Sequence, residues 1–177
     1  MYKLLILSFA VLLCFGCGDG ESEIPDIPNN VELDLDEDGI PDFVITYILQ
    51  TEGDPVGNYK AIRMHIESFD DDQVLKNEDQ FPIFLSETGV IAPNVAVPFF
   101  WETTNPSSNV KTPIATIRTD YDEVTWNDEW TVFTLDTSET YLIGFKLING
   151  FNAEVGFIEF SVDLQSGRFN LLKTEFL

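Results

Sequence analysis

The sequence contains very little cysteine and histidine. Both cysteines, Cys14 and Cys17, precede residue 18, so no disulfide can join two parts of the chain beyond that point. The single histidine, His65, excludes a histidine-rich transition-metal site, and no Ser-His-Asp or Cys-His arrangement is visible around it. The fold must therefore be stabilised by its apolar core, by a metal ion or by both, and we expect no enzymatic activity.

Positive charge is also scarce. The chain has 9 Lys and Arg against 31 Asp and Glu, which gives a formal net charge of −22. Nucleic-acid partners are excluded because phosphate binding requires a basic face, and the same excess argues against lying flat on anionic lipid. Carboxylates that repel one another are a reason to expect divalent cations, although an acidic solvated surface needs no ligand.

Long apolar runs are absent except at the start of the chain. The run from Leu4 to Phe15 is too short for a permanent membrane helix of about 20 residues, but it has the size of a signal-peptide core. We therefore predict that residues 1–16 are a signal peptide and that the protein is exported.

The residues after this run, Gly16-Cys17-Gly18, resemble the lipobox of bacterial lipoproteins, in which the chain is cut before a cysteine that is then acylated. The resemblance implies that Cys17 is the lipid attachment site and that the protein is held at a membrane by this lipid. Members of the family usually have Leu at the position of Cys14 and a small residue at that of Phe15. An ordinary secretory signal is the alternative.

Residues 17–30 are predicted to be a flexible tether, because Gly, Ser, Pro and acidic residues dominate a stretch too polar to fold. The acidic run just after Cys17 resembles the signal that sends some lipoproteins of Gram-negative bacteria to the outer face of the outer membrane. The expected location is therefore the cell surface of such a bacterium.

Residues 31–177 have the length of a single domain and show the period-two pattern of β-strands. In 60–67, apolar Ile62, Met64 and Ile66 alternate with polar residues, which predicts a strand with one wet face and places His65 at the surface. The run 43–49 is more continuously apolar and indicates an interior strand. The segment 77–90 has room for a turn of helix.

The C-terminal third predicts three consecutive strands. The first two, 141–148 and 151–164, are separated by Asn149-Gly150, a strong signal for a type I′ hairpin turn. The turn 165–167 leads into a third strand over 168–176. Many short strands with Gly and Pro turns indicate an all-β fold, a single jelly-roll-like β-sandwich.

One motif carries chemistry. Residues 34–42 read D-L-D-E-D-G-I-P-D, in which carboxylates at positions one, three and five converge when a loop curls around the glycine at position six. Position seven offers its carbonyl, position nine adds another oxygen, and the glutamate at position four points outward. Hard oxygen ligands in this number suit a structural Ca²⁺. The predicted ligands are Asp34, Asp36, Asp38, Ile40 and Asp42.

The loop is not an EF-hand, since the twelfth position is Ile45 instead of Glu and the flanking segments are predicted strands. An affinity on the order of 10⁻⁴ to 10⁻³ M is expected of such extracellular sites. An acidic turn without an ion is the alternative interpretation. The remaining coordination would come from water or from a distant acid, with two groups of candidates left open: Asp70, Asp71 and Asp72, or Asp120 and Asp122.

The stretch Asp34 to Phe43 resembles the calcium loop of a group of secreted bacterial proteins with no established activity, in which "DLDxDGxxDF" runs straight into a strand. These proteins end in a pair of strands similar to 141–146 and 156–162, with Trp where this chain has Phe157. The resemblance implies export, a β fold and calcium, and no reaction. The loop also resembles those of FG-GAP and thrombospondin type 3 repeats, which occur in tandem.

We expect a non-enzymatic binding or scaffold module. Its candidate ligand surface is aromatic, because exposed Trp beside carboxylates is how glycan-binding sandwiches hold sugars; burial of these aromatics in the core is the alternative. The residues concerned are Trp101, Trp126, Asp128 and Trp130. Two other hypotheses are a glycoside hydrolase on a jelly roll, which needs paired carboxylates across a cleft, and docking to an outer-membrane protein.

Overall fold

In a computed structural model, the described residues are 25–54, 57–79, 82, 84–85, 91–104, 111–120, 126, 129–133 and 140–177. The predicted signal peptide, Cys17, Asp122 and Asp128 lie outside them. The described residues form strands and turns, with no helix among them and so none that is long and apolar enough to cross a membrane.

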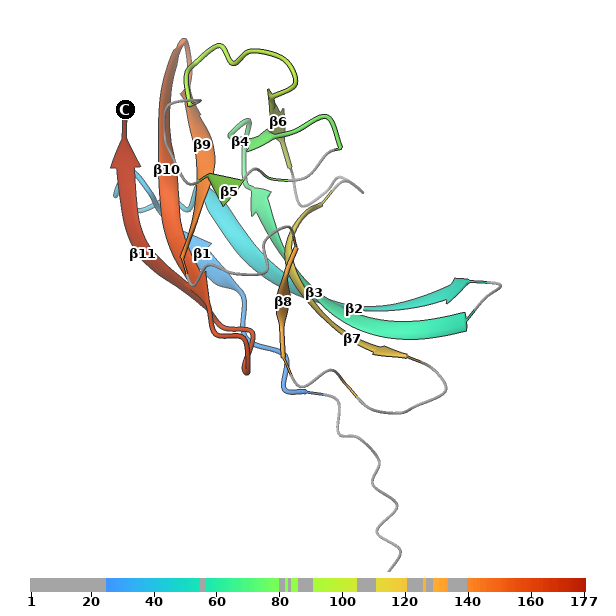
Figure 1. Ribbon diagram of the computed structural model, residues 1–177. Helices are drawn as coiled ribbons and strands as arrows, with labels where there is room; N and C mark the ends of the chain where they lie inside the picture. Colours follow the sequence, from blue (N-terminus) through green and yellow to red (C-terminus); the bar gives the residue numbers. More distant parts are fainter. Residues whose placement is uncertain are drawn as a thin grey trace, which may run out of the picture.

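The strands form two antiparallel sheets that face each other (Figure 1). The first sheet has the order β1 (Val31–Leu33), β2 (Phe43–Asp54), β3 (Gly57–Ser68), β7 (Thr112–Asp120) and β8 (Thr131–Val132). The second has the order β11 (Phe169–Phe176), β10 (Asn152–Val162), β9 (Tyr141–Asn149), β4 (Gln73–Lys76) and β6 (Phe100–Thr103), and β5 (Phe84–Leu85) also pairs with β9. The predicted all-β sandwich is confirmed.

The main core lies between the sheets and follows the period-two pattern. On β3 it takes Ile62, Met64 and Ile66, each fully buried, and on β10 it takes Ile158 and Phe160. Burial of such alternate side chains is the main favourable contribution to folding, about 25 cal/mol for each Å² of apolar surface. The sequence pattern therefore predicted both the strands and their inward faces.

A second, smaller apolar cluster covers the outer face of the second sheet. It contains Leu75, Ile91, Val155 and Phe157. Both faces of β10 are therefore buried near Phe157, whose side chain points away from the main core. The segment that contains Ile91 provides the cover, because its side chain packs against residues of β4 and β10.

Three expectations need correction: the position of the turn between β9 and β10, the type of that turn, and the exposure of His65. The β9–β10 turn is centred on Gly150 and Phe151 instead of Asn149 and Gly150, because Asn149 pairs with Asn152. Of these two central residues only Gly150 has a positive φ, 65°, which matches a turn with glycine at its first central position and not type I′. In the segment 77–90, strand β5 lies among the described residues, whereas residues 80–81, 83 and 86–90 lie outside them, so the expected turn of helix stays a prediction.

His65 is also misplaced by the sequence pattern, since it is only 3% exposed. It lies on the outer face of the first sheet, opposite Thr46 of β2 and Pro113 of β7. Its neighbour on the same face of β3, Glu67, is 1% exposed and pairs with Lys111 at 2.9 Å. Polar alternation predicted a wet face here, but this part of the outer face is buried.

Candidate metal site

The acidic loop joins β1 to β2. The two strands pair with Leu33 opposite Phe43, and the amide of Asp42 donates a hydrogen bond of 2.8 Å to the carbonyl of Leu33. Leu33, Leu35 and Phe43 are buried in the main core. The loop is therefore held at both ends by apolar side chains while its middle remains in solvent.

The loop curls as the sequence predicts. Gly39 has a φ of 89°, a left-handed conformation that glycine adopts without strain. Glu37, at the fourth position, is exposed as expected, but it is also left-handed, with a φ of 61°, which the sequence pattern did not indicate. Two residues with positive φ close together turn the chain sharply enough to bring its carboxylates inward.

Main-chain amides inside the curl donate to these carboxylates. The amide of Asp38 donates to one oxygen each of Asp34 and Asp36, both at 3.1 Å, and Gly39 donates to the other Asp34 oxygen at 2.8 Å. On the other side of the loop, Leu35 donates to Asp42 at 2.6 Å. The carboxylates are therefore oriented by the loop itself.

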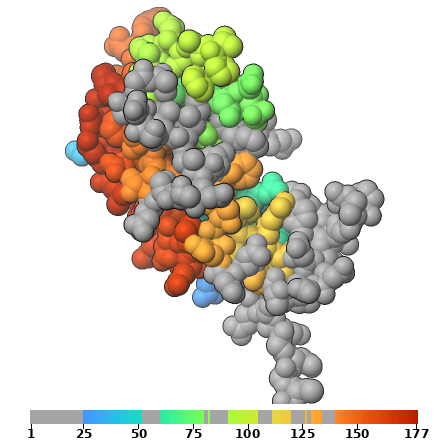
Figure 2. Space-filling view, viewed as in Figure 1, coloured from blue at the N-terminus to red at the C-terminus, as the bar shows by residue number. Residues whose placement is uncertain are grey.

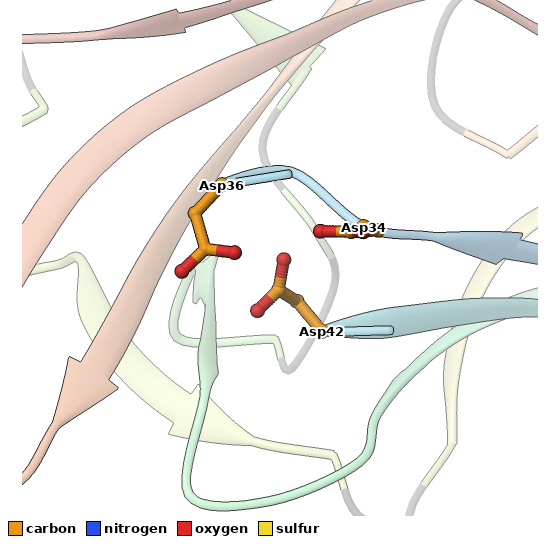
Figure 3. A group of neighbouring side chains, drawn as sticks. All are labelled: Asp34, Asp36 and Asp42. Carbon is orange, nitrogen blue, oxygen red and sulfur yellow. The ribbon is translucent and has the colours of Figure 1, made fainter. Parts of the chain in front are cut away.

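Three of the predicted ligands come together. Asp34, Asp36 and Asp42 each offer a carboxylate oxygen, and these oxygens all lie within 4.8 Å of one another (Figure 3). Oxygens that bind one calcium ion at about 2.3 to 2.6 Å can be at most about 5 Å apart, so the group satisfies this condition. Its donors are all hard oxygens, which favour Ca²⁺ or Mg²⁺ over softer metals.

The other two predicted ligands are placed differently. Asp38 is exposed and lies outside this group, and one of its carboxylate oxygens accepts a 2.8 Å hydrogen bond from the amide of Ile40. The side chain of Ile40 is 61% exposed, so only its main chain could serve an ion. Asp38 would have to turn from Ile40 to join the group.

The electrostatics of the group disfavour an ionised Asp42 without a cation. The pKa of Asp42 is raised from 3.8 to about 6. Burial is the largest cause, the hydrogen bond from Leu35 opposes it, and the charges of Asp36, Asp72 and Asp34 add to it. A cation placed among these oxygens would remove both the desolvation cost and the repulsion.

The structure also separates the two groups of distant acids. Asp72 is 7% exposed, and burial raises its pKa, with further contributions from Asp70 and Asp36. One of its oxygens accepts a 2.7 Å hydrogen bond from the amide of Ile148 on β9. Asp72 therefore lies close enough to Asp36 for their charges to interact.

Asp120 lies at the other end of the first sheet. It pairs with Tyr59 on β3, whereas the residue that follows the loop, Phe43, pairs with Ser68. Ser68 lies nine positions after Tyr59 on β3, which corresponds to about 30 Å along the strand. Asp120 is therefore too far away, and Asp72 is the distant acid that the fold brings near the loop.

The candidate aromatic surface does not form. Trp130 is 1% exposed and belongs to the main core, so the prediction of a surface role for it is wrong and the core interpretation holds. Trp126 forms an isolated antiparallel β-bridge with Thr119 and packs against the same core. Trp101 packs on the outer cluster of the second sheet and donates through Nε1 to the carbonyl of Ala92. Trp101 therefore lies apart from the other two indoles, both of which pack in or against the main core.

Two carboxylates line a hollow of about 450 Å³ between residues 26–31 and the β10–β11 turn. They are Asp26 and Asp163, both exposed. Hydrogen bonds from the Ser166 side chain and from the amides of Gln165 and Ser166 lower the pKa of Asp163. A glycosidase needs one carboxyl group with a raised pKa, and the lowered pKa of Asp163 does not fit that role.

Three features of the structure favour a cation site in residues 34–42. They are the curl of the loop, the convergence of three carboxylates and the nearby Asp72. Comparison of the chain with protein-family models, with curated proteins and with solved structures finds no match.

Proposed function

We propose that this protein is an exported, lipid-anchored β-sandwich domain that binds a structural calcium ion in the loop 34–42 and acts as a non-enzymatic binding or scaffold module. The observation that carries the calcium proposal is the convergence of Asp34, Asp36 and Asp42, whose oxygens lie within 4.8 Å of one another. The ion would be a structural one.

The bound ion would hold together three parts of the fold. Asp34 and Asp36 follow β1, Asp42 precedes β2, and Asp72 precedes β4 of the second sheet. Asp72 would act directly or through a water molecule, because one of its oxygens is already engaged by Ile148. An ion at this position would fix the start of the first sheet and connect it to the second.

The calcium proposal is tested by thermal unfolding with calcium, with magnesium and with chelator. The informative variant is Asp36→Ala, which removes the oxygen ligand, and its matched control is Glu37→Ala, which removes an exposed carboxylate of the same loop. Millimolar calcium should raise the Tm of the unaltered protein and of Glu37→Ala, but not that of Asp36→Ala. An unaltered protein whose Tm ignores both calcium and chelator would refute the site.

The anchor is proposed from the sequence around Cys17, and the acidic tether 17–30 would lift the domain from the membrane. Because residues 26–31 line a hollow of the domain, only residues 17–25 are free to extend, and fully extended they reach about 30 Å. Metabolic labelling with an alkyne fatty acid should mark the unaltered protein and a Cys14→Ser control, and Cys17→Ser should lose the label and leave the membrane fraction. Labelling that survives in Cys17→Ser would exclude this attachment site.

The proposed location is tested separately. Proteolysis of intact Gram-negative cells should degrade the domain if it lies on the outer face of the outer membrane.

A further inference from the structure

The free edge of β11 differs from the other edges of the two sheets. The outermost strands of the described sheets are β1, β8, β6 and β11, with 3, 2, 4 and 8 residues respectively. Native proteins keep free edges short because unpaired amides and carbonyls there attract another strand. Three of the four outermost strands follow this rule, and β11, which borders the molecule in Figure 1, does not. Residues 46–54 of β2 also lack a second neighbour among the described strands, because β1 covers only residues 43–45.

Backbone groups of β11 alternate between β10 and the open side. The amide of Leu177 donates to the carbonyl of Val155, so the odd-numbered residues near this end face β10. The amides and carbonyls of Thr174 and Phe176 therefore point to the open side. A bulge at Leu171 and Leu172 interrupts the strand, but the pairing from Lys173 to Phe176 is regular.

The side chains along this edge are apolar and exposed. Leu171, Leu172, Phe176 and Leu177 have exposed fractions of 44, 54, 41 and 57%. The atoms of this strand lie on the left border of the face shown in Figure 2. Edge strands that resist pairing carry charges, prolines or bulges. β11 has no proline, its two charges, Lys173 and Glu175, are paired with each other, and its bulge leaves the pairing of residues 173–176 regular.

A hollow of about 320 Å³ lies beside the end of the same edge. It is lined mainly by apolar residues, among them Ile91, Ala153, Val155 and Leu177, and it also contains Glu154. Peptides that extend a sheet obtain affinity from main-chain hydrogen bonds and selectivity from pockets for alternate side chains. The end of β11 offers both features together.

The negative charge of the chain favours a cationic partner at this edge. The chain has a net charge of −22. Around β11, the charges of Glu154, Glu159 and Glu175 are balanced only in part by Arg168 and Lys173. A second copy of the chain would bring the same large negative charge, and repulsion would oppose edge-to-edge pairing. An extended segment in which basic and apolar residues alternate would be attracted instead.

We propose that β11 is a docking edge for a cationic, extended peptide segment, which adds a strand to the second sheet and places an apolar side chain in the hollow beside Leu177. This role is independent of calcium and of the lipid anchor. It gives the domain a partner of defined chemistry, the exposed β-forming segment of a basic protein.

The test uses fluorescence anisotropy with a labelled, end-blocked peptide, Lys-Val-Lys-Val-Lys-Val-Lys, at low ionic strength. Two control peptides are Glu-Val-Glu-Val-Glu-Val-Glu, of opposite charge, and Lys-Pro-Lys-Pro-Lys-Pro-Lys, which keeps the charge but has few amides to donate. The first peptide should bind at least about tenfold more tightly than either control. Equal binding of the proline peptide would reduce the effect to general charge attraction and overturn the proposal.

The protein variant is Thr174→Pro, which removes an amide that faces the open edge and leaves the bonds to β10 in place. Its matched control is Thr174→Val, which keeps the amide. Thr174→Pro should weaken peptide binding by about tenfold and Thr174→Val by less than about threefold. Unchanged affinity in a folded Thr174→Pro protein would contradict docking at this edge.

Hydrogen exchange on the unaltered protein keeps the test valid if Thr174→Pro fails to fold. Saturating peptide should slow exchange of the Thr174 and Phe176 amides by about tenfold or more, because these amides would become hydrogen-bonded. Unprotected amides under saturation would overturn the proposal. Sedimentation without peptide tests whether the edge binds a second copy of the chain. An unaltered protein that is dimeric and a Thr174→Pro variant that is monomeric would show such pairing and would overturn the proposal.

Discussion

The hydroxyl of Tyr47, on β2 of the first sheet, donates a hydrogen bond of 3.0 Å to the carbonyl of Gly167, in the turn between β10 and β11 of the second. The same hydroxyl accepts a hydrogen bond of 3.2 Å from the amide of Phe169. The Tyr47 ring also meets Trp130 edge-on, with centroids 6.1 Å apart. One side chain therefore connects the two sheets at the end where residues 26–31 enter the domain.

The first prediction concerns this connection. Tyr47→Phe keeps the ring and its contact with Trp130 but leaves the carbonyl of Gly167 and the amide of Phe169 without their partner. The free energy of unfolding should fall by about 1 to 2 kcal/mol in urea denaturation. Replacing the fully exposed Phe151 by Leu is a control that should change it by less than about 0.5 kcal/mol. A Tyr47→Phe protein as stable as the unaltered one would mean that water replaces the hydroxyl at no cost.

The second prediction concerns Gly167. A Cβ atom added there would lie 2.2 Å from the Trp130 ring, and the residue has a φ of 70°. Gly167→Ala should therefore lower the free energy of unfolding by about 2 to 5 kcal/mol, from backbone strain and overpacking together.

Gly39→Ala is the matched control for Gly167→Ala. Gly39 has a φ of 89°, but nothing lies within 4 Å of an added Cβ. Only the backbone strain, about 1 to 2 kcal/mol, should appear when unfolding is measured with chelator present. Equal losses in the two variants would show that the Trp130 contact contributes nothing.

Much of the fold was predictable because its signals are local. Alternation in 60–67 and in the C-terminal third gave the strands, and the spacing of Asp34, Asp36 and Gly39 gave the curled loop. The turn between β9 and β10 was displaced by one residue, since Gly150 satisfies either central position and only the pairing of Asn149 with Asn152 decides between them.

The remaining features depend on contacts between distant parts of the chain. Asp72 approaches the loop because its carboxylate accepts a hydrogen bond from Ile148, 76 positions away, and no spacing rule indicates that. His65 and Glu67 lie on a strand face that alternation makes polar, but that face is buried here. Trp130 was predicted at the surface or in the core, and only the packing of the two sheets places it in the core.

The third prediction follows from the buried His65. Its pKa is lowered from 6.5 to about 4, with burial as the largest cause, the charge of Lys111 acting in the same direction and Glu67 opposing both. The unfolded chain therefore takes up a proton near pH 6.5 that the folded chain does not, so stability must fall as the pH drops from about 6.5 to about 4. Between pH 7 and pH 5 this one residue should cost about 2 kcal/mol.

His65→Gln tests this prediction, because it removes the titrating group while carboxyl groups such as Asp42 remain in both proteins. Urea denaturation at pH 7 and pH 5 should show that the unaltered protein loses about 2 kcal/mol more than the variant. The comparison is between two pH values, so any constant change in stability caused by the substitution cancels. The same pH dependence in both proteins would mean that His65 is protonated in the folded state already near its ordinary pKa.

The fourth prediction concerns Lys76, whose side chain is completely buried and whose Nζ lies 2.6 Å from the Glu102 carboxylate. Glu102 is 33% exposed, so the two partners are not equivalent. Glu102→Leu would leave a buried ammonium group without its partner and should cost about 3 kcal/mol, whereas Lys76→Met leaves a carboxylate that can turn to solvent and should be close to neutral. The double variant should recover most of the loss, because an apolar pair needs no desolvated charge. Urea denaturation of all four proteins measures the coupling free energy between Lys76 and Glu102. Equal losses of unfolding free energy in the two single variants would show that the burial of Lys76 does not determine the effect.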